Sequence, residues 1–441
     1  MEIIVSGNEN IIKLCGKQKQ KPGEKYRTSR FCVTLPCEDG TLYYQTMTGT
    51  LVLLKNDEIP DSCYKEFIEN WILVPEKFDE TRHLAQLRNV ARMVDKKNNT
   101  TGFTILTTTD CNARCFYCYE LGVKRLSMSE KTAHDIVDYI AEKSAGNSLK
   151  LRWFGGEPLF NRPVIEIISA GLMERDIPFE SKMVSNGFYL DAETAKQAKK
   201  EWHLENVQIT LDGTREIYNR VKAYIDKEAD PYTRVLNNIE SAMKSGIRVT
   251  IRLNINRKNA DNMLELAEEL GKRFGGNTML NVYVAVLHDY SGPVQGFHSA
   301  ASEDESALRI VKKLKTNGLY KIGKLPQKPR LNSCMADDDG CEVIMPDGRV
   351  LKCEHIEVAE TIGSIYSEDR DMALVRAWKE TADLPKCSTC ALQPLCFNLR
   401  KCPWVKDDCH SARQAIMLYN CEEQIRKTYM EYKEAEQEKR K

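Results

Sequence analysis

The sequence predicts an α/β protein built around a partial (β/α)6 barrel, and three observations lead to this prediction. Six apolar, strand-like runs alternate with helical segments between residues 103 and 287, which is the pattern of parallel βα units. Residues 1–97 carry β-branched and aromatic runs of a different kind, and nine of the sixteen cysteines lie between Cys334 and Cys421. Six units are fewer than the eight of a closed barrel, so we expect an open barrel between two smaller domains.

The N-terminal portion, residues 1–97, reads as a small α+β domain with a linker. Residues 26–33 and 41–53 have the composition of short antiparallel strands. Residues 61–72 form an amphipathic pattern that predicts a helix leading into a short strand at 72–74. A charged helical segment at about 79–97 links this unit to the barrel.

The barrel is expected to span residues 98–325. Its first helix should begin after Ser129, a favourable N-cap, and run to about Ser144. Residues 290–330, rich in Gly, Ser and Lys, are expected to be a connector. A cysteine-rich domain at 326–425 and a charged, solvated helical tail at 426–441 complete the chain. The expected strands are 103–107, 149–154, 180–184, 205–211, 247–254 and 279–287, and the other helices are 163–173, 191–200, 232–245 and 260–274.

Composition restricts the classes of function. Lys+Arg and Asp+Glu both number 64, so the net charge is +0 and nothing favours a nucleic-acid or anionic-membrane partner. No apolar run approaches a membrane span. We therefore expect a cytoplasmic protein. Because disulfides are disfavoured in that compartment, sixteen cysteines indicate metal or redox chemistry.

The most informative motif is a triplet with the spacing CxxxCxxC, formed by Cys111, Cys115 and Cys118. It follows the first predicted barrel strand, where ligand sites of such folds gather. Three thiolates bound to a four-iron cube leave one iron without a protein ligand, so a small molecule can coordinate there. A zinc half-site is the alternative, but no second CxxC or His pair follows within a domain length.

This triplet, with aromatic Tyr117 before its last cysteine, resembles the radical S-adenosylmethionine (SAM) superfamily. The resemblance implies that the open iron binds SAM and that one electron cleaves it to methionine and a 5′-deoxyadenosyl radical. Phe154-Gly-Gly-Glu-Pro158, one βα unit later, resembles the superfamily's methionine-binding element. Two glycines allow close approach to a ligand, and Glu157 adds a negative charge for an ammonium group. The cofactor-binding residues expected from strand ends are Gly155, Gly156, Glu157, Ser185, Asn186 and Arg252.

Ser185 and Asn186 would, by the same resemblance, face the ribose or carboxylate of SAM, and Asp212 would face the substrate. Arg252 alternates with Asn254 and Asn256 along the fifth strand, so these three side chains share one face. Turn or capping roles are the alternative for each of these strand-end residues.

The C-terminal cysteines resemble the SPASM domain, which carries two auxiliary iron–sulfur clusters in radical enzymes that modify peptides or proteins. A pair of zinc ribbons is the alternative. The resemblance implies three [4Fe-4S] clusters in all, and Glu354, directly after Cys353, would be a catalytic base or a surface carboxylate. Because the spacing from Cys396 departs from the family pattern, Cys409 could replace Cys402 or Cys421. The implied ligands are Cys334, Cys341, Cys353 and Cys402 for the first auxiliary cluster and Cys387, Cys390, Cys396 and Cys421 for the second.

The N-terminal unit is similar in layout to the winged-helix recognition element of peptide-modifying radical enzymes, which grips a precursor's leader at a sheet edge. The implied function is an oxidoreductase: a maturase that crosslinks a ribosomally made peptide, most plausibly through a Cys thioether. An electron donor such as flavodoxin or ferredoxin would be a second partner. The alternatives are a sulfatase-maturing, formylglycine-generating enzyme, a maturase that forms C–C crosslinks or epimerises residues, and a non-catalytic zinc-binding interaction protein.

Overall fold

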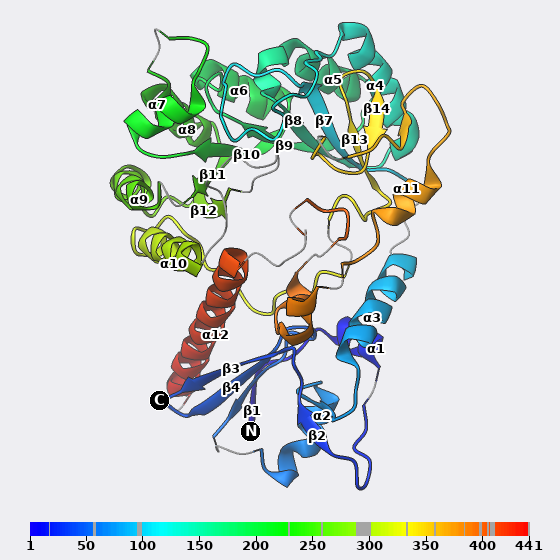
Figure 1. Cartoon of the computed structure of the whole chain (residues 1–441), viewed down its shortest axis with the longest axis vertical. Coiled ribbons are helices and arrows are strands. Elements are labelled where there is room, and N and C mark those ends of the chain that lie inside the picture. Colours follow the sequence, from blue (N-terminus) through cyan, green and yellow to red (C-terminus); the bar gives the residue numbers. More distant parts are fainter. Residues whose placement is uncertain are drawn as a thin grey trace.

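The computed structural model contains two lobes joined by the C-terminal part of the chain (Figure 1). The barrel forms one lobe, and the N-terminal unit forms the other, together with much of the last helix. The structure describes residues 1–439 except 17, 56–58, 95–98, 228–229, 257–258, 288–300, 332–333, 357–358, 383, 397–398, 404 and 406–410, and leaves the side chains of 301–304 and 411 undescribed.

The N-terminal unit is a four-stranded antiparallel sheet of order β1-β5-β4-β3 with helices packed against it. Alternate residues of its strands face opposite sides, and both sides are covered. On one side, Phe67 and Ile68 are fully buried against the sheet. The elements are β1 (Glu2–Val5), α1 (Glu9–Cys15), β2 (Tyr26–Thr28), β3 (Cys32–Cys37), β4 (Gly40–Gln45), β5 (Leu51–Leu54), η1 (Asp61–Cys63), α2 (Tyr64–Glu69), β6 (Leu73–Pro75) and α3 (Glu80–Val94).

Six parallel strands, paired in chain order, form the barrel and confirm the predicted α/β fold. Each predicted strand and helix lies within two residues of an observed one. Ser129 caps α4 by accepting the Thr132 amide, as expected. The strands are β7 (Gly102–Thr108), β8 (Leu149–Gly155), β9 (Phe179–Ser185), β10 (Leu204–Leu211), β11 (Arg248–Ile255) and β12 (Leu280–Val286).

Two helices in the barrel were not predicted. The first, α7 (Arg215–Lys222), follows β10 directly. The second, α10 (Ala301–Thr316), corrects the expected connector at 290–330. Ala307, Ile310, Val311 and Leu314 repeat at helical spacing and are buried against the barrel, so an apolar stripe outweighs the Lys-rich composition. The remaining barrel helices are α4 (Glu130–Ser144), η2 (Pro158–Asn161), α5 (Arg162–Glu174), α6 (Ala192–Glu201), α8 (Pro231–Lys244) and α9 (Ala260–Phe274).

The cysteine-rich region extends the barrel sheet instead of forming a separate sheet. Strand β13 pairs in parallel with β7, and β14 and β15 continue the sheet beyond it. Val343 and Ile344 of β13 are fully buried. Their burial stabilises the pairing of β13 with β7, so a segment distant in sequence covers the β7 edge of the barrel sheet. Its elements are β13 (Cys341–Ile344), β14 (Arg349–Leu351), β15 (Gly363–Ser364), α11 (Met372–Ala377), η3 (Pro385–Thr389) and η4 (Gln393–Leu395).

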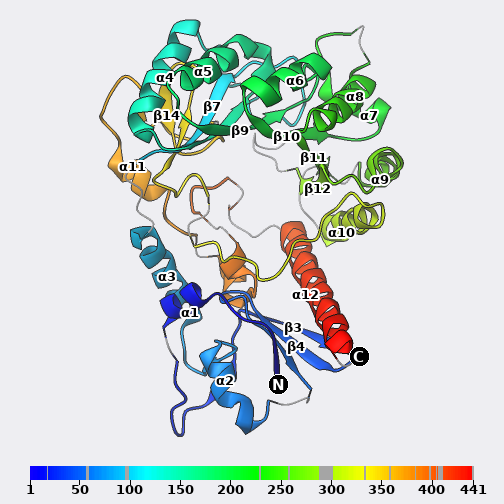
Figure 2. The ribbon, with the colours of Figure 1, turned by 180° about the vertical axis from the view of Figure 1, so that it is seen from behind.

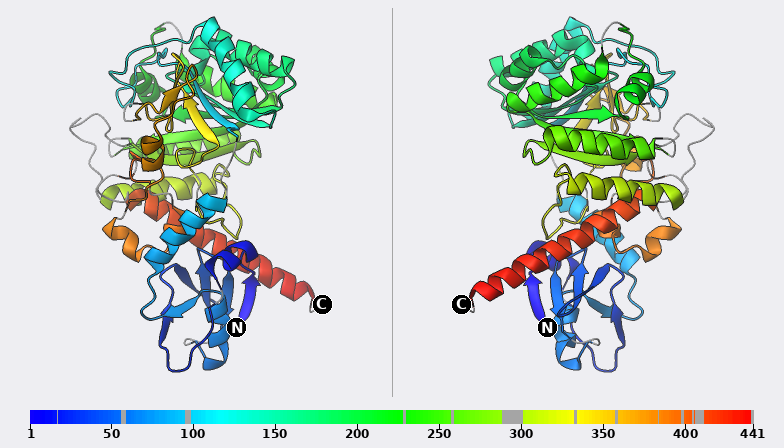
Figure 3. Two further views of the ribbon diagram at one scale, coloured as in Figure 1. Left: turned by 90° about the vertical axis from the view of Figure 1, so that its right-hand side faces the viewer. Right: turned by 90° about the vertical axis from the view of Figure 1, so that its left-hand side faces the viewer.

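The final helix, α12 (Ser411–Lys439), is not the wholly solvated tail that composition suggests. Cys421, Ile425 and Tyr429 are buried against the second face of the N-terminal sheet. The helix runs obliquely past that sheet, and both termini lie at the same end of the molecule (Figures 2 and 3). Within the described residues, no helix is both long and apolar enough to cross a membrane.

Candidate functional site

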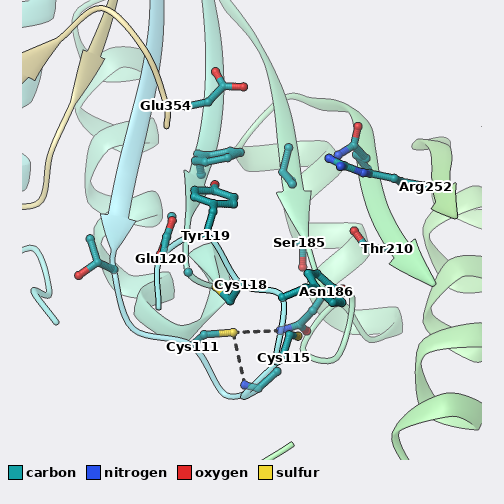
Figure 4. Close-up of a pocket in the computed structure, with 18 of the residues that line it drawn as sticks. Cys111, Cys115, Cys118, Tyr119, Glu120, Ser185, Asn186, Thr210, Arg252 and Glu354 are labelled. Atoms are coloured by element: carbon teal, nitrogen blue, oxygen red, sulfur yellow. Dashed lines mark hydrogen bonds between the residues drawn. The ribbon is translucent and has the colours of Figure 1, made fainter. Parts of the chain in front are cut away.

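The candidate site is a cavity of about 590 Å³ at the carboxyl ends of the barrel strands. The three cysteines of the triplet lie at one end of it, and Glu354 lies at the other (Figure 4). The inner face of the strands is polar, since Arg152, Gln208 and Arg252 project into the cavity at alternate strand positions. The outer face of the same strands is apolar and is packed under the helices.

The triplet occupies the loop after β7, as predicted, and all three cysteines line the cavity. The Cys111 sulfur accepts the Ala113 amide at 3.3 Å and the Asn186 side-chain amide at 3.7 Å. Burial raises the pKa of Cys111 to about 12 and that of Cys118 to about 11. Binding to iron removes those protons, and N–H donors to sulfur are a normal feature of iron–sulfur sites. The thiol set therefore fits a cluster. Among the described side chains, no group of three or more His, Cys, Asp or Glu residues is arranged to hold a single metal ion.

The two glycines after β8 make room for the cysteine loop itself. A Cβ atom on Gly155 would lie 2.0 Å from the Thr108 carbonyl oxygen, and one on Gly156 would lie 2.4 Å from that of Asp110. The backbone amides of Gly156 and Glu157 donate to these same two carbonyls, each at 3.0 Å. The glycines therefore bring the β8 loop into register with the triplet, in addition to lining the cavity.

Glu157 does not lie on the cavity wall, which differs from its expected contact with a ligand ammonium group. Its carboxyl group is fully buried. It accepts hydrogen bonds from the Asn186 amide at 2.7 Å, the Ser185 hydroxyl at 2.8 Å and the Leu159 amide at 3.1 Å. Burial raises the pKa of Glu157 to about 7, against the lowering effect of these donors. Glu157 thus positions Ser185 and Asn186, which do line the cavity.

Asp212 is also buried behind the wall, where it pairs with Lys222. The Lys222 ammonium lies 3.0 Å from one Asp212 oxygen, and Asn254 donates to the other at 3.1 Å. Burial acts to lower the pKa of Lys222, but the Asp212 carboxylate together with Tyr117, Cys115 and Tyr218 more than offsets this, and the pKa is raised. Sequence reasoning missed Lys222. A signal was present, because it follows the buried Tyr218 at helical i,i+4 spacing.

The end of the cavity away from the cysteines carries charged groups from two distant segments. Arg152 of β8 forms a 3.2 Å ion pair with Glu354, which enters from the cysteine-rich region. The Tyr119 and His355 rings lie 4.9 Å apart beside them. Arg252 donates to Asn254 at 2.9 Å, and both line the cavity, as their shared strand face predicted. Arg152 was not among the expected site residues.

The C-terminal cysteines fall into two groups of three. Cys334, Cys353 and Cys402 share one buried cluster. Burial, with Cys402 contributing, raises the pKa of Cys334 to about 11. Cys341 begins β13, next to Gly102.

Cys387, Cys390 and Cys396 form the second group. Burial raises the pKa of Cys387, and the other two thiols add to the effect. Cys421 is fully buried in an apolar cluster that Cys390 contacts. Cys409 lies outside the described residues.

Two arginines of the N-terminal unit hold the loop of the second thiol group. Arg30 donates to the carbonyl oxygens of Cys387 and Ser388 at 2.6 and 2.8 Å. Arg88 is 4% exposed and donates to those of Gln393 and Cys396 at 3.1 and 2.8 Å. The N-terminal unit is therefore one wall of the C-terminal thiol site, a contact that no sequence pattern indicated.

Residues 105–270 match the model of the radical SAM superfamily. Over 178 residues, the chain is 29% identical to a probable GTP 3′,8-cyclase of Thermococcus kodakarensis, covering 39% of this chain and 54% of that protein. The chain thus spans about half the length of the curated relatives it matches. Two solved structures share the fold. One is anSMEcpe with bound AdoMet and Cp18Cys peptide (TM-score 0.57, 15% identity, 76% of this chain and 99% of that chain). The other is Streptococcus suis SuiB bound to precursor peptide SuiA (TM-score 0.50, 14% identity, 85% and 95%).

The model match indicates a radical SAM domain within residues 105–270, the segment that carries the triplet, and the two solved structures show the same fold. That superfamily implies a [4Fe-4S] cluster and SAM, and the cysteine end of the cavity has the thiols and polar groups to hold them.

Proposed function

We propose that this protein is a radical SAM maturase that crosslinks a ribosomally made peptide through a Cys thioether. The observation that carries the proposal is one cavity lined by two parts of the chain, with a third part packed against the second. The radical SAM domain supplies the cysteine end, the cysteine-rich region supplies Glu354 at the other end, and the N-terminal unit contacts the cysteine-rich region. A peptide bound to each of two structures of similar fold supports a peptide substrate.

In this proposal Cys111, Cys115 and Cys118 hold the first cluster, and the polar side chains beside them orient SAM. When bound, the cluster supplies the electron that cleaves SAM and so releases the radical that abstracts a substrate hydrogen. Asn186 and Ser185, fixed by Glu157, face the cofactor end of the cavity. Arg252 offers a cation for a carboxylate.

The substrate segment would lie between this end and the Arg152–Glu354 pair. Formation of a thioether removes one hydrogen atom from carbon, one proton from the thiol and one further electron. In this proposal Glu354 accepts the proton, and its position on the cavity wall supports that role. The two C-terminal thiol groups, which we propose hold two auxiliary clusters, would provide the electron acceptor.

We further propose that the N-terminal unit binds the leader of the precursor as an added strand. Strand β3 is one edge of its sheet, and strand addition at an exposed edge is a common mode of peptide recognition. One face of the sheet at β3 carries Val33 and Leu35, which are buried under α12, so a peptide would pair along the edge and not lie on this face.

Anaerobic purification and co-expression test the proposal. Three clusters predict brown protein with about twelve irons per chain, and substitution of all three triplet cysteines by Ala should remove about four. Co-expression with a short Cys-containing precursor encoded beside the enzyme should lower the peptide mass by two hydrogen atoms per crosslink. Colourless protein containing zinc, or an unchanged peptide mass, contradicts the proposal.

The relatives named as GTP 3′,8-cyclases provide the rival substrate. Their matches cover 36–60% of this chain, and the radical SAM domain at residues 105–270 is a part that a shared reaction type would explain without a shared substrate. Incubation of the reduced protein with SAM and GTP should give no consumption of GTP. Conversion of GTP, with no change in the peptide, would favour the rival.

A further inference from the structure

A lysine ammonium is buried directly behind the cysteine loop. The Lys222 side chain is 4% exposed and lines the cavity from the end of α7. Its Nζ donates at 3.1 Å to the hydroxyl of Tyr117, which lies between the second and third cysteines of the triplet. Its backbone carbonyl accepts the Arg114 amide at 2.8 Å and lies 3.9 Å from the Cys115 sulfur. Lys222 therefore meets the loop with both its main chain and its charge.

The partner of this lysine is the carboxylate of Asp212, which directly follows β10. Asp212 Oδ2 is 3.0 Å from the ammonium, and Asp212 is itself held by the Asn254 amide. The Lys222 ammonium contacts the cysteine loop through the Tyr117 hydroxyl, whereas the Asp212 carboxylate contacts Lys222 and Asn254 of β11. The positive end of the ion pair therefore lies against the loop, and the negative end is held by a barrel strand.

Removing two charges from water to form a buried ion pair costs free energy. The direction in which the Lys222–Asp212 pair is held can offset that cost where a second charged group binds beside it. An iron–sulfur cluster gains negative charge when it is reduced, and the charge around it sets its reduction potential. The tendency of a nearby cation to favour the reduced state is strongest in a buried site, where water screens the interaction least.

We propose that Lys222 is a positioning residue that holds a positive charge against the cysteine loop and raises the reduction potential of the cluster bound there, with Asp212 orienting it. The inference concerns only the radical SAM domain, so it stands or falls independently of peptide modification. It also gives Asp212 a role other than the expected contact with substrate.

The test is a potentiometric titration of the reconstituted protein, followed by the electron paramagnetic resonance signal of the reduced cluster. Each variant is made in a background in which Cys387 and Cys390 are Ala, so that the triplet signal is easier to resolve. In Lys222→Met, the ratio of reduced to oxidised cluster at the parent's midpoint should fall about tenfold, the order expected of one buried charge. A tenfold change in this ratio is 59 mV for a one-electron couple. Lys222→Arg should restore the parent potential, and Lys131→Met, an exposed lysine of α4, should leave it unchanged.

Iron content and resting absorption are measured beside each titration. The two neutral variants, Lys222→Met and Lys222→Gln, could lose the cluster while Lys222→Arg keeps it. In that case the iron content, and not the reduction potential, shows that the cluster requires a positive charge at this position. An unchanged midpoint in fully loaded Lys222→Met overturns the proposal. Equal shifts, or equal cluster loss, in the Met and Arg variants also overturn it, because the side-chain shape and not the charge would then be responsible.

Discussion

Glu157→Gln should remove a pH dependence of stability that one buried carboxyl group creates. The group is fully buried and accepts three hydrogen bonds, and burial raises its pKa from 4.5 to about 7. Between these two pH values the unfolded chain has released its proton while the folded chain still holds it. Because the folded state then binds more protons, stability falls as pH rises through this window.

The magnitude follows from the separation of the two pKa values. One pH unit is worth about 1.4 kcal/mol per proton, so the full effect in the wild type is about 3 kcal/mol. The free energy of unfolding of the wild type should decline by that amount, relative to the Gln variant, between pH 4.5 and about 7. Above about pH 7 both states of the wild type are ionised, and the difference between the two proteins should become constant.

Hydrogen exchange of β9 amides, measured by mass spectrometry across this range, reports the local unfolding energy. A local probe is appropriate because a chain with several structural units need not unfold in one step. Glu180→Gln is the matched control, since Glu180 is an exposed glutamate of β9, the strand whose amides are measured. Parallel pH profiles for the wild type and Glu157→Gln would refute the reasoning.

Three further predictions concern the loops around the thiol sites. Gly155→Ala should weaken SAM binding at least tenfold in equilibrium dialysis, because the added Cβ would lie 2.0 Å from the Thr108 carbonyl oxygen. Gly146→Ala is the control, since a Cβ there would have nothing within 4 Å. Equal SAM binding by both variants would count against the steric argument. Asp212→Asn should lower the free energy of unfolding of the barrel by about 3–5 kcal/mol in denaturant, because the Lys222 ammonium stays buried without its carboxylate partner. A decrease below about 1 kcal/mol would show that the ion pair does not stabilise the fold. Arg88→Met should lower the iron content by about four atoms per chain and leave 5′-deoxyadenosine formation unchanged, because Arg88 holds the loop of the second C-terminal thiol group. Arg82→Met is the control, since Arg82 is exposed on the same helix. Full iron content in Arg88→Met would exclude this role.

Local sequence signals predicted most of the barrel correctly because each of its elements follows a simple rule. The strands are apolar runs, and Ser129 is both a favourable N-cap and the observed one. The rule failed where composition and spacing disagreed. In α10 the Lys-rich composition suggested a connector, but Ala307, Ile310 and Leu314 repeat with helical period and are buried.

The candidate site was predicted in its sequence-local parts and not in its long-range contacts. Cys111, Cys115, Cys118, Ser185 and Asn186 line one cavity because the carboxyl ends of neighbouring parallel strands meet at one edge of the sheet. Glu157 follows the second barrel strand, as the sequence predicted, but its carboxyl group is buried away from the cavity wall. That direction depends on donors from β9, which lie about thirty residues away.

By itself, the sequence determined the βα alternation, the cysteine triplet and the thiol-rich C-terminal region, because periodicity and spacing are local properties. Only the tertiary structure decided that Lys222 pairs with Asp212 behind the triplet, that Glu354 enters the barrel cavity, and that Arg30 and Arg88 wall the C-terminal thiol site. Each of these contacts joins segments from different elements. Their geometry follows from how β13, α7 and the N-terminal sheet pack, and no local pattern carries that information.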